Sequence, residues 1–161
     1  MAEADIDGVA AVHVRTWQIA YAGIVPADYL ARLDPAVNAE NRRTKPAPAG
    51  AQTIVAVDDG KILGFASFGP YRDEPAGGEL YAIYIDPDAW NRGIGRRLLD
   101  AARDGLRAAG FPDMRLWVLE ENHQARRFYE RMGLAPDGTR HYYTPRGTHV
   151  ELPELRYATP L

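Results

Sequence analysis

The sequence predicts an α+β fold, with one domain over residues 1–161 built around a mixed β-sheet of about six strands. Length sets the domain count, because 161 residues, 46% of them hydrophobic, suit one domain with one sizeable core. Hydrophobic periodicity indicates the elements: helical spacing over residues 6–21, strand-like alternation from residue 52, and a strand–helix–strand unit over residues 79–120. That unit predicts a parallel pair of strands, whereas hairpins predict antiparallel pairs, so the sheet is mixed.

Two helices and a loop are predicted before the first strand. Apolar residues over 6–21 recur at helical spacing after Asp5, an acidic starter, which indicates an amphipathic helix. Pro26 then opens a second, short helix through Leu33, since proline is common in the first turn. Residues 34–50 contain three prolines and a basic patch without periodicity, so a loop is predicted there.

A hairpin and a central strand are predicted next. Residues 52–68 alternate between apolar and polar on both sides of Asp59 and Gly60, a pair that suits a two-residue hairpin turn. Residues 79–85 are apolar on both faces, which indicates a strand in the middle of the sheet. The sequence Asp86-Pro87-Asp88 ends this strand.

The C-terminal half is predicted to alternate helix and strand and then to close with a hairpin. A long amphipathic helix begins after Gly93 and ends at Gly110, and residues 114–120 form a strand parallel to the central one. A short helix follows, capped by Asn122. Residues 138–160 alternate around a turn and predict the closing hairpin.

Composition excludes several classes of function. The net charge of −3 and the pI near 5.8 argue against a nucleic-acid partner held by bulk electrostatics. No apolar run approaches the roughly 20 residues of a membrane span, and the acidic start is unlike a signal peptide, so we expect no membrane contact and a cytoplasmic protein. The absence of cysteine excludes thiolate metal sites and a cysteine nucleophile. Histidines and carboxylates show no ligand spacing, so no metal is expected.

Two glycines and three arginines stand at the entrance of the long helix. Gly93 and Gly95 leave the backbone bare, and Arg92, Arg96 and Arg97 add positive charge beside them. Free N–H groups and the helix dipole favour an anion such as phosphate there. A tight turn beneath a solvated arginine face would explain the same residues. The dinucleotide fingerprint lacks its third glycine and the P-loop lacks its GK[ST] segment, so neither nucleotide fold is supported.

Two segments resemble motifs of the GNAT-type N-acetyltransferases. The segment IYIDPDAWNRGIGRRLLDAA resembles their pyrophosphate motif, Q/R-x-x-G-x-G/A, and LWVLEENHQARRFYERMGL resembles the strand and helix that follow it. The resemblance extends more weakly over nearly the whole chain and implies helices on both faces of the sheet and splayed central strands. Trp90 departs from the family's usual Gln or Arg. The family's first strand either is absent or lies upstream of Met1, and we predict a sheet without it.

The resemblance implies transfer of an acetyl group from acetyl-CoA to a primary amine of a small molecule or peptide. Direct attack within a ternary complex is favoured, because a cysteine acyl-enzyme is unavailable. Pantetheine amides are expected to pair with the backbone of Ile83 and Ile85, and the pyrophosphate to lie on the helix entrance. A bulge in this strand is expected to aim an N–H at the thioester oxygen, with Ile83 and Tyr84 as the candidates for that donor. The residues expected to bind coenzyme A are Ile83, Tyr84, Ile85, Arg92, Gly93, Ile94, Gly95, Arg96, Arg97 and Asn122.

The resemblance also assigns catalytic roles. Tyr129 is the expected acid for the leaving thiolate, although helical spacing alone would make it a core residue. Glu79 is the expected base, and a solvent-facing acid at a strand end is an equal alternative. The other residues considered for the base are Tyr84, His141 and Glu151, and those expected to contact the acceptor are Tyr21, Tyr29 and His141.

Two other readings stay open on the sequence alone. A catalytically silent acyl-CoA-binding sensor or docking module would share the fold and bind the same ligand without turnover. A nucleotide-binding domain would prefer NAD or ATP to coenzyme A. The acceptor is not identified, and a homodimer is left open because GNAT-type proteins often form dimers.

Overall fold

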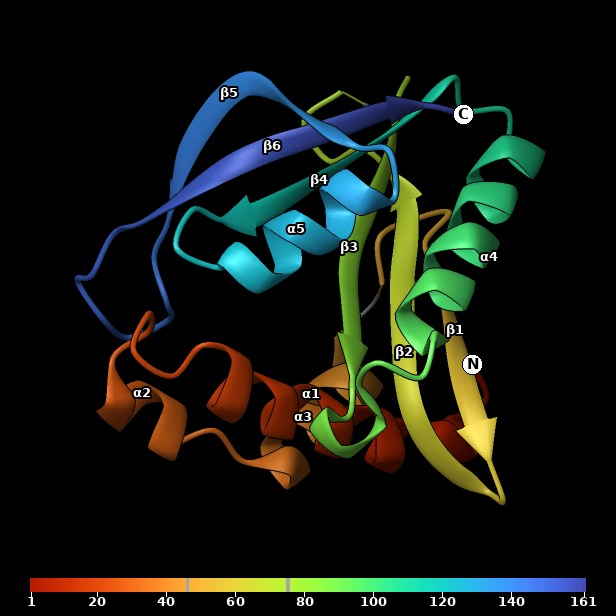
Figure 1. Ribbon diagram of the computed structural model, residues 1–161. Coiled ribbons are helices and arrows are strands. Elements are labelled where there is room, and N and C mark those ends of the chain that lie inside the picture. Colours follow the sequence, from red (N-terminus) through yellow and green to blue (C-terminus); the bar gives the residue numbers. More distant parts are fainter. Residues whose placement is uncertain (46, 75) are drawn as a thin grey trace.

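A six-stranded mixed sheet forms the centre of the computed structural model, which describes residues 1–45, 47–74 and 76–161 (Figure 1). Its strand order is β1-β2-β3-β4-β6-β5, with β3 and β4 parallel and every other neighbouring pair antiparallel. The mixed sheet and its strand number are as predicted, and in the described part of the chain no strand of this sheet precedes β1. The elements are η1 (Glu3–Asp5), α1 (Ile6–Ala20), α2 (Ala27–Ala31), α3 (Pro35–Thr44), β1 (Gln52–Asp58), β2 (Lys61–Pro70), β3 (Gly78–Ile85), η2 (Pro87–Ala89), α4 (Ile94–Ala108), β4 (Asp113–Leu119), α5 (His123–Arg131), β5 (Ala135–Tyr143) and β6 (Leu152–Pro160).

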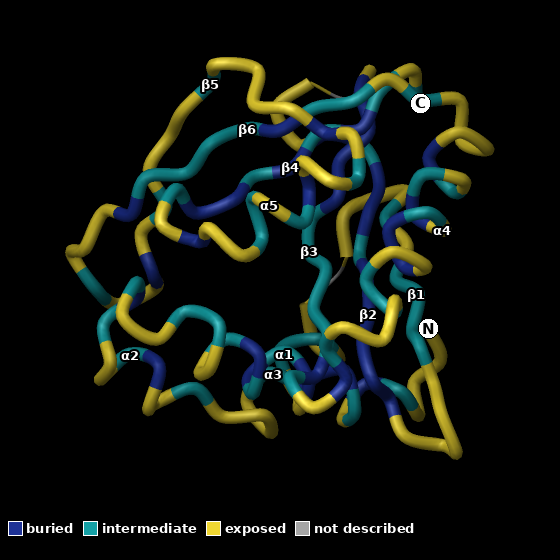
Figure 2. The backbone as a smooth tube through the Cα atoms, in the orientation of Figure 1, coloured by how far each residue is buried: buried dark blue, intermediate teal, exposed yellow. Residues whose placement is uncertain are grey.

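Helices cover both faces of the sheet, as predicted. On one face, Val9 and Val12 of α1 pack against Phe65 of β2. On the other face, α4 packs over β2, and Ala66 and Phe68 of this strand belong to one core cluster with residues of α4 and α5. Strand β2 is buried along most of its length because it lies between these two layers (Figure 2).

The prediction of a loop throughout residues 34–50 is wrong, because α3 occupies Pro35–Thr44. Asp34 caps this helix by accepting a hydrogen bond from the Ala36 amide at 2.7 Å, and Pro35 stands at its first position. Only Ala39 of the helix is buried. The helix therefore leaves no apolar stripe in the sequence, and its cap is the signal that could have revealed it.

Strands β3 and β4 part soon after they meet. Their parallel pairing is confined to Gly78–Met114 and Glu79–Arg115, whereas β4 pairs with β6 on its other edge along its whole length. The extra residue of a bulge in β3 is Tyr81, because Ala82 and Leu80 face consecutive residues of β2. The splayed central strands are thus confirmed, and the bulge in β3 lies before Ile83 and Tyr84, the predicted candidates for the N–H donor.

Gly105 brings α4 into close contact with the sheet. A Cβ at this position would lie 2.6 Å from Cε2 of Phe68, a ring that is itself fully buried. We expect Gly105→Ala to lower the free energy of unfolding by about 1–2 kcal/mol, because overpacking costs about 1–3 kcal/mol and the gain in helix propensity returns at most about 1. Urea denaturation measures this loss. In a Phe68→Leu background the same substitution should cost less, and an equal loss there would contradict the clash.

No helix in the described ranges is both long and apolar enough to cross a membrane.

Candidate functional site

The entrance of α4 presents free backbone amides. Gly93, the N-cap, adopts φ 76°, a left-handed conformation that favours glycine. The amides of Ile94, Gly95 and Arg96 belong to the first turn, where a helix offers no internal acceptor. The prediction that the Arg97 amide also binds the anion is wrong, because it donates to the carbonyl of Gly93 at 3.2 Å.

The three arginines of this turn do not act together. Arg96 lines the cavity described below. Arg92 lies 3.4 Å from Asp58 of β1, and Arg92 and Arg97 both line a separate hollow between β1 and α4. Neighbouring helix residues point about 100° apart, so Arg96 and Arg97 leave the helix in different directions. The predicted cofactor contacts of the Arg92 and Arg97 side chains therefore lie outside the cavity.

A cavity of about 570 Å³ runs from this entrance, past the parting strands, to α1. Such a volume is typical of a small-molecule site. Among the described residues, the predicted site residues that line it are Tyr21, Glu79, Ile83, Tyr84, Ile85, Gly93, Ile94, Gly95, Arg96, Asn122, Tyr129 and His141. The exposed Glu151, considered as a base, does not line it.

The cavity passes through the sheet. On β6, Leu155 and Tyr157 pack in the core beneath α4 and α5. Glu154 precedes Leu155 and so points to the opposite face, toward α1. Since Tyr129 of α5 and Glu154 both line the cavity, the opening between β3 and β4 connects the two faces of the sheet. A ligand on the α5 side can therefore meet a second ligand on the α1 side.

The backbone of β3 turns polar groups toward this opening. The Asp86 amide donates to the Leu63 carbonyl of β2 at 2.8 Å. Because successive residues direct their polar groups to opposite edges, those of Tyr84 also face β2, and those of Ile83 and Ile85 face the opening. An extended ligand with amide groups could add to this edge as a strand would.

Trp90 fixes the turn between β3 and α4. Its indole nitrogen donates to the carbonyl of Ile85 at 2.8 Å, and the Thr16 hydroxyl of α1 donates to the same carbonyl at 3.1 Å. Only the amide of Ile85 thus remains for a ligand. Where the sequence motif departs from Gln or Arg, the tryptophan contributes a structural hydrogen bond and an apolar wall.

Helix α5 contributes the two predicted residues on the α5 side. Asn122 is its N-cap and accepts a hydrogen bond from the Ala125 amide at 3.1 Å, so the capping role is confirmed. Tyr129 is 8% exposed, and burial, assisted by the nearby Tyr84, raises the pKa of its hydroxyl. The hydroxyl therefore stays protonated throughout the neutral and mildly basic range.

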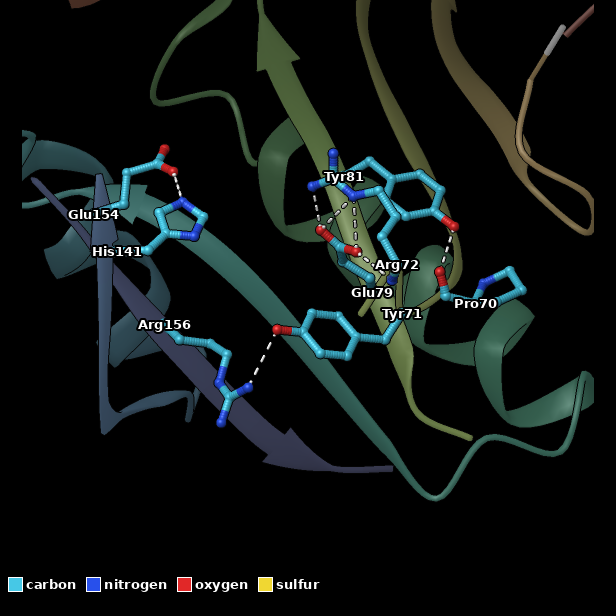
Figure 3. A network of polar contacts seen from close by, with 8 residues as sticks. All are labelled: Pro70, Tyr71, Arg72, Glu79, Tyr81, His141, Glu154 and Arg156. Carbon is cyan, nitrogen blue, oxygen red and sulfur yellow. Dashed lines mark hydrogen bonds and ion pairs between the residues drawn. The ribbon is translucent and has the colours of Figure 1, made fainter. Parts of the chain in front are cut away.

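Glu79 is held by an arginine from the loop before it. Its carboxylate is 1% exposed and binds the Arg72 guanidinium, with the shortest contact at 2.5 Å (Figure 3). The Arg72 amide also donates to it at 3.1 Å. Both oxygens of Glu79 are thus engaged by a bidentate arginine, although the Arg72 side chain is itself 57% exposed.

Aromatic residues wall the α1 side. Tyr21 and Tyr84 line the cavity, and burial raises the pKa of both hydroxyls. Tyr29 was predicted to contact the acceptor but lies outside the lining. It packs behind the wall, with its ring centroid 6.3 Å from that of Trp17.

A histidine–glutamate pair completes this wall. His141 of β5 lies opposite Glu154 of β6, and its Nε2 is 2.6 Å from Oε2 of Glu154 (Figure 3). The imidazole stacks on Trp117, with 3.8 Å between ring centroids. Sequence analysis missed Glu154 and Trp117. Cross-strand pairing in the predicted hairpin is the signal that could have joined Glu154 to His141.

No group of three or more His, Cys, Asp or Glu side chains suited to a metal ion occurs in the ranges described.

Comparisons with known proteins agree with this geometry. Residues 16–134 match the model of the "Acetyltransferase (GNAT) family". The chain is 40% identical to "Uncharacterized N-acetyltransferase YuaI" of Bacillus subtilis over 73% of its own length and 68% of that protein. It is 30% identical to "Probable N-acetyltransferase Rv2775" of Mycobacterium tuberculosis over 95% and 87% of the two lengths. In fold it is similar to the PaiA N-acetyltransferase of Thermoplasma acidophilum solved with coenzyme A, with a TM-score of 0.74, 18% identity and coverage of 100% and 96%.

Proposed function

Because the chain belongs to the GNAT family of acetyltransferases, we propose that it transfers an acetyl group from acetyl-CoA to a primary amine by direct attack in a ternary complex. The observation that carries this proposal is the opening between β3 and β4. Free amides of α4 lie at one end of it, and an aromatic wall with carboxylates lies at the other. A donor and an acceptor can therefore meet without a covalent enzyme intermediate.

The residues of the α4 entrance fit the pyrophosphate of coenzyme A. The amides of Ile94, Gly95 and Arg96 would bind it, and Arg96 adds a guanidinium. A Cβ at Gly95 would lie 3.3 Å from Ile85 and 3.4 Å from Phe128, so the first turn of α4 is tightly packed against these two side chains. The presence of coenzyme A in the Thermoplasma structure supports the same ligand here.

The β3 edge and α5 would hold the rest of that molecule. We assign the pantetheine arm to the backbone of Ile83 and the amide of Ile85, with the side chain of Asn122 beside them. When bound, acetyl-CoA supplies a thioester whose carbonyl carbon an amine can attack. Tyr129 then has a proton available at its hydroxyl for the sulfur of the leaving group.

On the α1 side, the acceptor must lose a proton before it can attack. Two carboxylates of the described lining, Glu79 and Glu154, face this side. We assign the adjacent wall of Tyr21, Tyr84 and His141 to binding of the acceptor. Its carboxylates suit a positively charged ammonium group, and its aromatic rings suit the carbon atoms next to that group.

Amine-dependent release of free thiol from acetyl-CoA tests the proposed function. The purified protein is incubated with acetyl-CoA and, one at a time, with an alkyl monoamine, a diamine, an amino sugar and a peptide with a free N-terminus. We expect release of free thiol that depends on one or more amines, with the acetylated amine detected by mass spectrometry. Coenzyme A binding by calorimetry without turnover of any amine would instead support the silent binding module.

A further inference from the structure

We propose that Glu154 is the catalytic residue that takes the proton from the acceptor amine, and that His141 is a positioning residue that holds its carboxylate. This inference rests on the proposed acetyl transfer to an amine. It assigns to Glu154 the role that the sequence resemblance gave to Glu79.

The contacts of the two carboxylates separate their roles. Arg72 occupies both oxygens of Glu79 with four hydrogen bonds, three of them from its side chain. Glu154 receives one bond, at Oε2 from His141, and within the described residues no bond to Oε1 is present. Glu154 therefore has a lone pair free for the amine, whereas Glu79 would first have to release an arginine.

Glu154 also occupies the right place. It lies opposite Leu119, the last residue of β4, where β3 and β4 have already parted. It faces the α1 side of the sheet, opposite the α5 side on which Tyr129 lies. An amine that reaches the opening from the α1 side thus passes Glu154 before it meets a thioester bound from the α5 side.

The surroundings favour proton uptake by Glu154. Burial raises the pKa of its carboxyl, and the hydrogen bond from His141 opposes part of that rise. The titratable and charged groups near it are Tyr21 just after α1, Arg72 of the loop before β3, Glu79 and Tyr84 of β3, and His141 and Tyr143 of β5. A base with a raised pKa binds the released proton more readily near neutral pH.

The proton balance closes with the groups present. Glu154 takes one proton from the ammonium group, and the freed lone pair forms the N–C bond to the thioester carbon. The C–S bond breaks with its electron pair on sulfur, which accepts a hydrogen bond from the Tyr129 hydroxyl. As that hydroxyl passes its proton to sulfur it takes up the second proton of the nitrogen, and Glu154 releases the first to solvent.

The first test compares Glu154→Gln with Glu79→Gln in the full chain. We expect Glu154→Gln to lower kcat/KM by at least about 100-fold, the size of a lost general base, with coenzyme A affinity within about twofold. Glu79→Gln should lower activity less and should lower the melting temperature, because Arg72 loses its partner. Glu121→Gln, at an exposed turn outside the cavity lining, is the matched control and should leave kcat/KM and the melting temperature unchanged.

Three results would overturn the proposal. Full turnover by Glu154→Gln would refute the role of Glu154 as the base but not the acetyl-transfer function. No turnover of any amine by the wild type would refute both the role of Glu154 and the acetyl-transfer function. A strict loss of activity in Glu79→Gln, with a folded protein and an active Glu154→Gln, would return the base to Glu79.

A second test does not depend on turnover. His141→Phe keeps the ring stacked on Trp117 but removes the N–H that holds Glu154. Carbon-13 NMR of the glutamate carboxyls, with the Glu154 signal identified by its absence in Glu154→Gln, should show a pKa above the ordinary value that rises further in His141→Phe. The acidic limb of the pH–rate profile should move to higher pH by the same amount as the pKa of Glu154. The shift should be the same for acceptor amines of different basicity. His141→Gln, which retains a donor, should restore part of the shift. An unchanged carboxyl titration would overturn the positioning role.

Discussion

Gly95→Val is expected to weaken binding of coenzyme A by at least about 100-fold. Gly95 contributes the central amide of the free first turn, and its Cα faces Ile85 and Phe128 with no space for a branched side chain. Helical side chains lean toward the N-terminus, so the valine methyl groups would cover the amides that receive the pyrophosphate. A hydrogen bond to a charged group contributes about 1.5–3 kcal/mol. Loss of two such bonds corresponds to roughly 100-fold or more in Kd.

The crowded side chain should also lower the free energy of unfolding, since overpacking costs about 1–3 kcal/mol. Valine in a helix is a few tenths of a kcal/mol more favourable than glycine, which offsets part of the tight contact with Phe128. Calorimetry with coenzyme A and a thermal melt on the same sample separate the two effects. Ala108→Val places the same side chain at the exposed far end of α4 and should bind normally. Equal affinity of Gly95→Val and wild type would remove the α4 entrance from the proposed site.

The parts of the fold that the sequence predicted are those in which one local rule decides the outcome. Asp59 and Gly60 both adopt positive φ in the two-residue turn, as the hairpin required. Helix α4 was found because Leu98, Ala102 and Leu106 form a buried stripe. Helix α3 was missed because its exposed sequence carries no such stripe, so only the Asp34 cap marks it.

The α4 entrance could be predicted because its chemistry depends on the backbone. Gly93, the N-cap, marks where α4 begins and therefore which amides are free, whichever residues surround them. The roles of the arginine side chains could not be predicted in this way. Arg96 and Arg97 are neighbours in sequence, yet helical geometry sends one into the cavity and the other toward β1.

The carboxylates illustrate what the sequence could not predict. The role of Glu79 depends on Arg72, which reaches it across the loop between β2 and β3. Glu154 reaches the cavity because β6 lies next to β4, a pairing between strands distant in sequence. Residue spacing carries no record of either contact, so the partner of each carboxylate emerges only in three dimensions.

Tyr129→Phe is expected to lower kcat by about 100-fold while changing the affinity for acetyl-CoA by no more than about threefold. The substitution removes one hydroxyl from a buried ring and keeps the packing against Phe128 and Tyr157. Loss of a general acid or of a hydrogen bond to developing thiolate charge costs about 10²-fold or more in rate. Because the raised pKa keeps the hydroxyl protonated, wild-type activity should show no basic limb from Tyr129 in the neutral to mildly basic range.

The matched control for that loss is Tyr142→Phe, which removes a phenol hydroxyl from an exposed position on β5 outside the cavity lining. It should leave kcat unchanged. Single-turnover kinetics with acetyl-CoA and an accepted amine would place the Tyr129→Phe defect in the chemical step, since product release cannot limit a single turnover. A loss of acetyl-CoA affinity as large as the loss of kcat would instead mean that Tyr129 shapes the cavity. The thiolate would then take its proton from solvent or from the attacking nitrogen, and the need for a buried phenol at the opening between β3 and β4 would be one of packing alone.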